Sequence, residues 1–234
     1  MHVPDGYIDA PTSVAFGVVA VAGLAMCVRG SRKELDERTA PMAGLVAATI
    51  FAVQMLNFPV AAGTSGHLLG GALAAILVGP YTGALCVSVV LLVQTLFFAD
   101  GGLSALGLNI TNMALTTALV GWVVFRILMR VLPQTKSSVV ASTAVAAFLS
   151  VPASALMFTL EYAMGGMAEV PVGTVLAAMV GVHGFIGVGE AVISAMVVAA
   201  VLAARPDLVF GARGVQRPLE LRTASITPQT PTSA

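Results

Sequence analysis

Residues 172–204 read VGTVLAAMVGVHGFIGVGEAVISAMVVAAVLAA, an apolar stretch in which Glu190 is the one charged residue. A helix needs about 20 mainly apolar residues to cross the hydrocarbon core of a bilayer. This stretch is therefore long enough to cross a membrane with some tilt or a kink. It indicates a protein whose fold is set by lipid rather than by water.

The composition of the whole chain agrees with that reading. Hydrophobic residues make up 58% of its 234 residues and charged residues only 9%, whereas soluble domains carry roughly 25% charged residues. The mean hydropathy is +0.96. Eleven basic and eleven acidic residues give a net charge of zero, and these sparse charges exclude nucleic-acid binding. We expect an integral protein of the cell's inner (plasma) membrane.

Apolar runs separated by Gly, Pro and charged residues predict about seven transmembrane helices. Continuous apolar runs exclude a β-barrel, whose strands alternate in polarity. We therefore predict an all-α, multi-pass bundle that forms one transmembrane substrate-binding domain over residues 1–206, followed by a polar, mobile cytoplasmic tail over 207–234. The predicted segments are 11–29, 41–57, 66–79, 81–98, 107–132, 138–164 and 172–204.

The basic residues fall into three clusters that orient this bundle. Loops rich in Lys and Arg face the cytoplasm, and the three clusters share one side only if the short segment 66–79 crosses as well. The N-terminus is then outside and the C-terminus in the cytoplasm. The clusters are Arg29, Arg32, Lys33 and Arg38; Arg126, Arg130 and Lys136; and Arg205, Arg213, Arg217 and Arg222.

The chain begins Met1-His2-Val3-Pro4-Asp5-Gly6, and we expect residues 1–10 to form a metal-chelating segment. The Met1 amine, the His2 amide and the His2 imidazole can close a five-membered and a six-membered chelate ring. Pro4 stiffens the exit of this segment, and Asp5 begins a turn. No basic region or cleavage site of a signal peptide is present. We expect Met1 to remain, and its amine to matter more than its side chain.

A second candidate site surrounds His67, in the glycine-rich stretch GTSGHLLGG over residues 63–71. A histidine at the start of a membrane segment is costly without a partner and marks a functional candidate. If the outward N-terminus folds down to His67, four nitrogen donors meet. Such a set favours Ni(II) or Cu(II) over Mg²⁺ and Ca²⁺, which prefer oxygen.

Four ordered sequence blocks resemble the CbiM/NikM family, the substrate-specific membrane components of cobalt and nickel energy-coupling-factor transporters. The blocks are MHVPDG over residues 1–6, GTSGHLLGG over 63–71, QTLFFADGG with LGLNITNMA over 94–102 and 106–114, and HGFIGVGEA over 183–191. The resemblance covers residues 1–204. The first two blocks are closer to the nickel members than to the cobalt members.

This resemblance implies that the Met1 amine, the His2 amide and imidazole, and His67 hold Ni²⁺ or Co²⁺ as the transported substrate, with no organic cofactor. It also implies partners: a pair of ABC-type ATPase subunits and a transmembrane coupling subunit. An accessory membrane subunit, if needed, is a separate chain. No Gly-x-x-x-x-Gly-Lys-[Ser/Thr] phosphate loop occurs here, so ATP hydrolysis belongs to the partners and this chain is not an enzyme.

Other polar residues of the apolar segments admit two roles. Asn109 and Asn112 share a helical face, and with Gln94 and Asp100 they either orient the ligating segment or bond between helices. Asp5 and Asp100 are the carboxylates expected to bind metal if nitrogen donors do not.

His183 and Glu190 also share a helical face, and we expect them to bond between helices rather than to bind metal. Glu161 needs a partner that the sequence does not identify. Cys27 and Cys86 lie in apolar runs and are expected to be inert packing residues.

An alternative from another class is a rhomboid-like intramembrane serine protease. Gly63-Thr64-Ser65-Gly66 fits a Gly-x-Ser-Gly pattern, and His183 is the candidate base for Ser65. This alternative leaves the Met1–Gly6 segment without a role. A channel is disfavoured because no repeated charged residues are present to line a pore.

Overall fold

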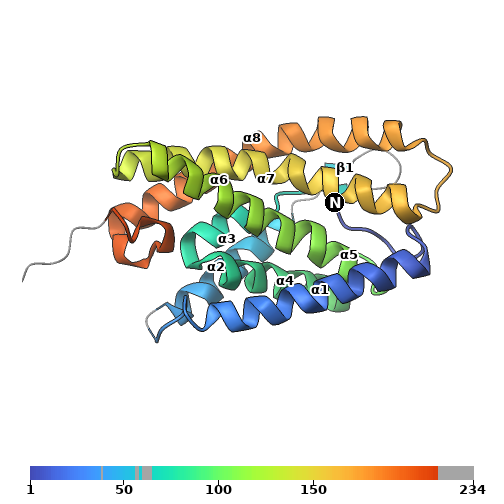
Figure 1. Cartoon of the computed structure of the whole chain (residues 1–234), viewed down its shortest axis with the longest axis horizontal. Coiled ribbons are helices and arrows are strands. Elements are labelled where there is room, and N and C mark those ends of the chain that lie inside the picture. The colour runs from blue at the N-terminus through green and yellow to red at the C-terminus, as the bar shows by residue number, and fades with distance from the viewer. Residues whose placement is uncertain (38, 56–57, 60–64, 216–234) are drawn as a thin grey trace, which may run out of the picture.

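The structure is a computed structural model that describes residues 1–37, 39–55, 58–59 and 65–215. It is a helical bundle in which the N-terminus lies inside, between the helices (Figure 1). Two short strands, β1 and β2, pair antiparallel. The elements are α1 (Ala10–Ser31), α2 (Ala40–Gln54), β1 (Phe58–Pro59), β2 (Ser65–Gly66), α3 (Gly71–Val78), α4 (Pro80–Phe98), α5 (Leu106–Asn109), the π-helix η2 (Ile110–Thr116), α6 (Thr117–Val131), α7 (Lys136–Gly165), α8 (Val172–Ala204), η3 (Pro206–Leu208) and η4 (Phe210–Ala212).

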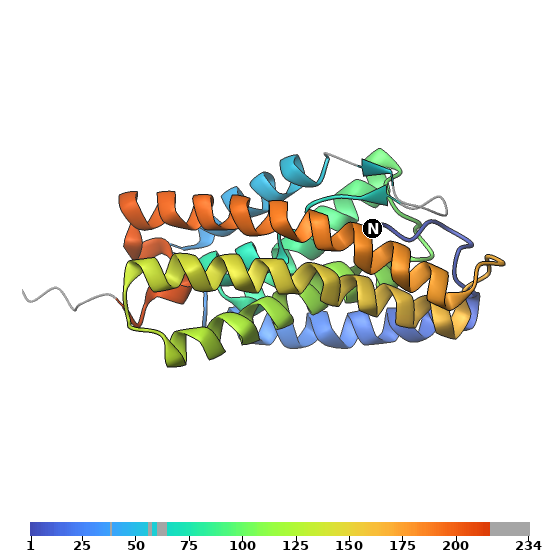
Figure 2. The ribbon, with the colours of Figure 1, turned by 90° about the horizontal axis from the view of Figure 1, so that it is seen from above.

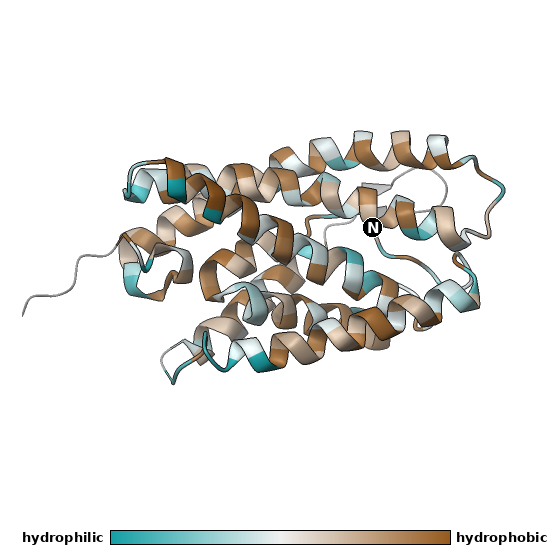
Figure 3. Cartoon of the chain, in the orientation of Figure 1, coloured by the Kyte–Doolittle hydropathy of each residue, from teal (hydrophilic) through white to brown (hydrophobic). Residues whose placement is uncertain are grey.

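The prediction of an all-helical membrane protein is confirmed. Within the described residues, five helical stretches are long and apolar enough to cross a membrane: α1, α4, the continuous run Leu106–Val131, α7 and α8. Apolar residues dominate the helices, while hydrophilic residues concentrate at helix ends and connections (Figure 3). The helix α2 is shorter, at 15 residues.

The predicted helix over 66–79 is wrong in its first half. The helical part, α3, covers only Gly71–Val78, eight residues, or about 12 Å of rise against a hydrocarbon core of about 30 Å. Residues 66–70 are buried and lie outside any helix. Gly70 adopts a left-handed φ of 77° immediately before the helix. Non-helical backbone at membrane depth is tolerated only where protein groups satisfy its N–H and C=O groups. Here the partners are the side chains of Glu190 and Gln54.

Helix α1 begins where it does because of a local cap. The Asp9 carboxylate accepts a hydrogen bond from the Thr12 N–H at 2.9 Å, and Pro11 suits the first turn of a helix. The Asp9 N–H donates to Gly165 O at 2.7 Å, at the far end of α7. Residues 1–9 are thus fixed at their C-terminal end and turn back into the bundle (Figure 2).

The described basic residues gather at one end of the bundle. The Lys136 ammonium, at the start of α7, donates to Leu202 O near the end of α8 at 3.3 Å. Glu34, just after α1, accepts from the Thr82 N–H of α4 at 2.7 Å. Arg213 donates to the Glu34 carbonyl at 3.4 Å. The predicted topology requires the basic clusters to share one side, as they do here. That this end of the bundle faces the cytoplasm stays a prediction.

The packed bundle extends beyond residue 206, the predicted end of the transmembrane domain. Val209 and Ala212 are buried, and Phe210 lies against Trp122 with ring centroids 5.4 Å apart. The Arg213 guanidinium lies 4.3 Å from the Phe210 ring centroid. Residues 207–213 are therefore part of the bundle rather than of a polar tail, because they bring apolar side chains of their own. The rest of the predicted tail, 216–234, lies outside the described residues.

Candidate metal centre

The N-terminal segment enters the bundle because its main chain finds hydrogen-bond partners there. The Val3 N–H donates to Asn109 Oδ1 at 2.7 Å, and Asn109 Nδ2 donates back to Val3 O at 3.2 Å. The Gly102 N–H donates to the same carbonyl at 2.8 Å. Buried main-chain groups need such partners. Met1 and Val3 are fully buried and His2 is 4% exposed, so the start of the chain is an internal part of the fold.

Glycines allow the loop after α4 to lie directly on this segment. A Cβ on Gly102 would come within 2.3 Å of the Asp5 nitrogen, and one on Gly101 within 3.1 Å of the His2 ring. Gly101 also has a φ of +94°, which side chains on L-residues rarely allow. The Asp5 carboxylate accepts hydrogen bonds from the Ser104 hydroxyl and from the Ser104 N–H, the latter at 2.8 Å, and these bonds lower its pKa. Asp5 therefore ties the terminus to the loop.

His2 and His67 face each other at the inner end of the segment. Gln94 Oε1 lies 3.2 Å from His2 Nε2, and Leu68 O lies 2.8 Å from His67 Nδ1. The Leu68 carbonyl oxygen only accepts, so His67 Nδ1 carries a hydrogen. The other two ring nitrogens, His2 Nδ1 and His67 Nε2, lie 3.1 Å apart. At this distance the two nitrogens can share a hydrogen or bind one metal ion.

Negative charge and a neutral amine complete the surroundings. Asp100 Oδ1 lies 3.0 Å from His2 Nδ1. Burial lowers the pKa of the Met1 α-amine from 8.0 to about 5, although the charge of Asp100 acts in the opposite direction. The amine is therefore neutral near pH 7 and has a lone pair to donate. Amine, imidazoles and carboxylate lie within one buried region.

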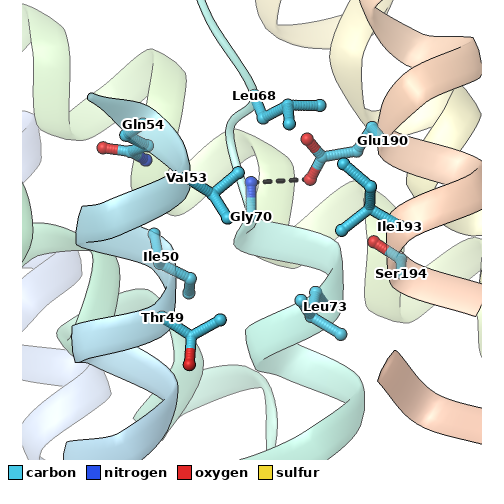
Figure 4. A pocket seen from close by; sticks show the side chains of 10 residues that line it. All are labelled: Thr49, Ile50, Val53, Gln54, Leu68, Gly70, Leu73, Glu190, Ile193 and Ser194. Carbon is cyan, nitrogen blue, oxygen red and sulfur yellow. Dashed lines mark hydrogen bonds between the residues drawn. The ribbon is translucent and has the colours of Figure 1, made fainter. Parts of the chain in front are cut away.

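The chain after His67 is held from two helices (Figure 4). The Glu190 carboxylate of α8 accepts from the Leu69 N–H at 2.8 Å and the Gly70 N–H at 2.6 Å. Gln54 of α2 donates from Nε2 to Leu69 O at 2.7 Å. These bonds satisfy the non-helical backbone that replaces the predicted helix. Beside them lies a small cavity of about 20 Å³, room for one water molecule.

The other polar candidates separate into different roles. Asn112 Nδ2 donates to Glu161 Oε2 at 3.0 Å, which gives Glu161 the partner that the sequence did not identify. His183 Nδ1 donates to Met179 O of its own helix at 2.7 Å, so this bond is within α8 rather than between helices. The Ser65 side chain lies outside the described part of the chain.

Sequence reasoning missed two residues that hold the site. Gln54 and Ser154 are both fully buried. Gln54 bonds to Leu69 O in the segment after His67, and the Ser154 hydroxyl contacts the Met1 sulfur. A lone amide within the apolar segment 41–57 is a signal that marks Gln54. Ser154 gave no signal, because serine is common among the small residues of membrane helices.

Within the described residues, no three His, Cys, Asp or Glu side chains cluster closely enough to hold a metal ion. The N-terminal segment brings further nitrogens, the Met1 amine and the His2 amide, into the same buried part of the bundle as the two imidazoles.

Comparisons with known proteins point to one family. A family model described as cobalt uptake substrate-specific transmembrane region, CbiM, matches residues 2–208. The chain is 39% identical over 210 residues to a protein of Haloquadratum walsbyi named for metal transport, covering 90% of this chain and 94% of that protein.

Other relatives carry more specific names. The chain is 33% identical over 218 residues to the cobalt transport protein CbiM of Geobacter sulfurreducens, covering 89% of this chain and 61% of that protein. It is 30% identical over 230 residues to the fused nickel transport protein NikMN of Rhodobacter capsulatus, covering 93% and 66%. A crystal structure of a truncated transition metal transporter superposes with a TM-score of 0.80 at 28% identity, over 87% of this chain and 99% of that one.

Proposed function

Because this chain belongs to the family of cobalt uptake substrate-specific transmembrane regions, CbiM, and is a cobalt/nickel transport component of the membrane, we propose that it is the substrate-binding component of an energy-coupling-factor transporter. It captures divalent nickel, or cobalt, at a buried centre. The donors are the Met1 amine, the His2 amide and imidazole, and the His67 imidazole. Family membership also disfavours the protease alternative on Ser65 and His183, since the relatives are named as transport proteins.

The observation that carries this proposal is the approach of His2 Nδ1 to His67 Nε2, 3.1 Å apart. Two nitrogens bound to one metal at right angles, each about 2.0–2.1 Å away, lie about 2.9 Å from each other. The two imidazoles are thus already spaced as neighbouring ligands. Gln94 and Leu68 contact the other nitrogen of each ring, as outer partners of metal-binding histidines commonly do.

The charges suit a divalent cation. A four-nitrogen donor set favours tetragonal Ni(II) or Cu(II), and a deprotonated His2 amide would contribute one negative charge. The Asp100 carboxylate, 3.0 Å from His2 Nδ1, supplies a second. Together they neutralise the ion in a region from which water is largely excluded. The sequence blocks favour nickel over cobalt.

We further propose that the chain works with two ABC-type ATPase subunits and a transmembrane coupling subunit. The given sequence has no phosphate-binding loop, so an ATP-driven transporter that contains this chain would take its ATPase from another polypeptide. The basic end of the bundle, with the start of α7 and the end of α8, would face the cytoplasm where those ATPases act.

The test is a change at each end of the chain. A Gly-Ser extension before Met1 converts the amine into an amide and displaces the new terminus, so bound metal should be lost. The same extension after Ala234 should leave binding intact. Bound nickel and cobalt are measured by elemental analysis after loading both purified forms with equal amounts of the two ions. Equal stoichiometry in the two forms would mean that the amine is not a ligand.

A further inference from the structure

The side chain of Met1 is among the largest fully buried side chains of the protein, at 0% exposure. A terminal residue is ordinarily frayed and solvated, and the proposed metal centre requires only the amine of this residue. Burial of the whole thioether side chain deep in the bundle therefore needs an explanation of its own.

Ser154, in the middle of α7, provides the polar contact to this side chain. Its hydroxyl oxygen lies 3.2 Å from Met1 Sδ and 2.6 Å from Asn112 O in the π-helix η2. A serine has one hydroxyl hydrogen, which here is directed toward both acceptors. Ser154 thus joins the N-terminal residue, η2 and α7 at one point. A π-helical segment within an α-helix, such as η2, is frequently found at a functional site.

We propose that Met1 is a positioning residue through its side chain: the thioether, seated against Ser154, fixes the direction of the α-amine toward His2 and His67. This inference rests on the proposed function, because it presumes that the amine is a metal donor. The Sδ atom and the amine nitrogen are joined through only Cγ, Cβ and Cα. Once the sulfur and the Val3 peptide are both held, little torsional freedom remains for the amine.

The geometry assigns the thioether to anchoring and not to ligation. The Ser154 hydroxyl occupies a lone pair of the sulfur, and soft thioethers select Cu(I) rather than Ni(II). The gain for metal binding is preorganisation: the flexible methionine side chain is ordered when the protein folds and not when the ion arrives. The centre therefore depends on the kind of side chain at residue 1 as well as on a free amine.

Residue 1 can be varied if a cleavable signal sequence is placed directly before it, so that processing releases Met, Leu or Ala as the first residue. Mass spectrometry of the purified chains confirms a free terminus. In nickel calorimetry we expect Met1→Ala to weaken affinity by about 10-fold or more, within the range seen for outer partners of metal ligands. The nickel affinity of Met1→Leu should lie between those of the Met and Ala forms, because leucine fills much of the space but offers no sulfur to accept a hydrogen bond. Unchanged affinity in Met1→Ala overturns the proposal.

A double-mutant cycle tests the contact itself. Ser154→Ala should weaken nickel binding when residue 1 is Met and have a smaller effect when it is Leu. Ser150→Ala is the matched control, since Ser150 is also fully buried on α7 but its hydroxyl donates to Ala147 O of its own helix. An equal effect of Ser154→Ala in both backgrounds would mean that Ser154 serves only Asn112, and would overturn the proposal.

These outcomes separate this inference from the proposed function. If the N-terminally extended chain still binds nickel, the amine is not a donor and the proposed function fails. If the extension abolishes binding but Met1→Ala binds as tightly as Met, only the role of the side chain fails. Absorption spectra add a second check, because no sulfur-to-nickel charge-transfer band should appear with Met at residue 1.

Discussion

The Nδ1 atom of His2 lies 3.1 Å from the Nε2 atom of His67, although 65 residues separate them in the chain. The other nitrogen of each ring lies beside an oxygen, Gln94 Oε1 for His2 and Leu68 O for His67. The two facing nitrogens are therefore spaced as two neighbouring ligands of one metal ion would be. The expected behaviour of the site follows from this contact.

Nickel binding should depend on His67 and not on His183. His67→Ala removes one of four proposed donors, and we expect a loss of affinity of about 100-fold or more, since outer partners alone change affinity by about 10–100-fold. His183→Ala should bind nickel within a few-fold of the unmodified chain, because His183 bonds to its own helix. Calorimetric titration of both variants, at matched helicity, measures the difference. Tight binding in His67→Ala would remove it from the ligand set.

Acidification should weaken metal binding and should also reduce the stability of the metal-free protein. The proposed donors would shed protons on binding metal, so metal affinity should fall as pH falls. The folded α-amine has a pKa of about 5, below its unfolded value of 8.0. Between these values the unfolded chain binds more protons, so the free energy of unfolding rises as pH increases from about 5 to about 8.

Thermal unfolding in detergent across this pH range, together with nickel titration, checks both statements. The N-terminally extended chain is the control, because it has no buried amine at the same place. Its stability should change less between pH 5 and pH 8. An identical pH profile in the two chains would contradict a buried, neutral amine.

Asn109 should affect nickel affinity through its two hydrogen bonds to the Val3 main chain. Asn109→Leu removes both the acceptor for the Val3 N–H and the donor to Val3 O, so the segment that carries His2 loses two of its anchors. We expect nickel affinity to fall about 10–100-fold. Thr111→Val is the matched control, since the Thr111 hydroxyl bonds to Gly107 O within its own helix. Equal affinities in these two variants would show that the clamp on Val3 is dispensable.

Glu190 should be needed for both stability and affinity. Glu190→Ala leaves the Leu69 and Gly70 N–H groups buried without their acceptor, at a cost of about 1–3 kcal/mol for each. The loosened segment then holds His67 less well, and nickel affinity should fall about 10-fold or more. Ser194→Ala, which lines the same cavity, should change neither quantity much. Thermal unfolding and calorimetry of the pair give the answer, and a stable, tightly binding Glu190→Ala would contradict this role.

Cysteine labelling tests the orientation of the bundle. In a background with Cys27→Ala and Cys86→Ala, we expect Lys33→Cys and Ser137→Cys to resist an impermeant thiol reagent in intact cells, because both positions lie at the basic end. Met167→Cys, exposed at the other end, should react. Labelling of Ser137→Cys from outside would reverse the proposed orientation, with the metal centre then opening toward the cytoplasm.

Much of the fold was accessible from the sequence because lipid imposes strict lengths on apolar helices. Six of the seven predicted segments match helical stretches within a few residues at each end. Segment 66–79 did not, because its first residues are apolar and glycine-rich but are held as non-helical chain by Glu190 and Gln54. Hydropathy predicts that these residues are buried. It does not predict whether their N–H groups form hydrogen bonds within a helix or with a side chain of another helix.

The same limit applies to the polar residues of the site. The sequence singled out Gln94, Asp100, Asn109, Asn112 and Glu190 as polar groups in apolar surroundings, but it left their partners open. The structure assigns the first two to His2, Asn109 to Val3, Asn112 to Glu161 and Glu190 to the segment after His67. Each pairing depends on how helices far apart in the chain are rotated against one another.

By itself, the sequence determined that this is a helical membrane protein and that its N-terminus and His67 carry nitrogens able to bind a metal, because apolar length and the chemistry of these groups are properties of the residues themselves. Only the tertiary structure decided that the two imidazoles meet, which of their nitrogens face each other, and that the Met1 side chain is buried against Ser154. Those facts depend on packing between segments 65 to 153 residues apart. Contacts at that range are set by the mutual fit of whole helices, which no local stretch of sequence specifies.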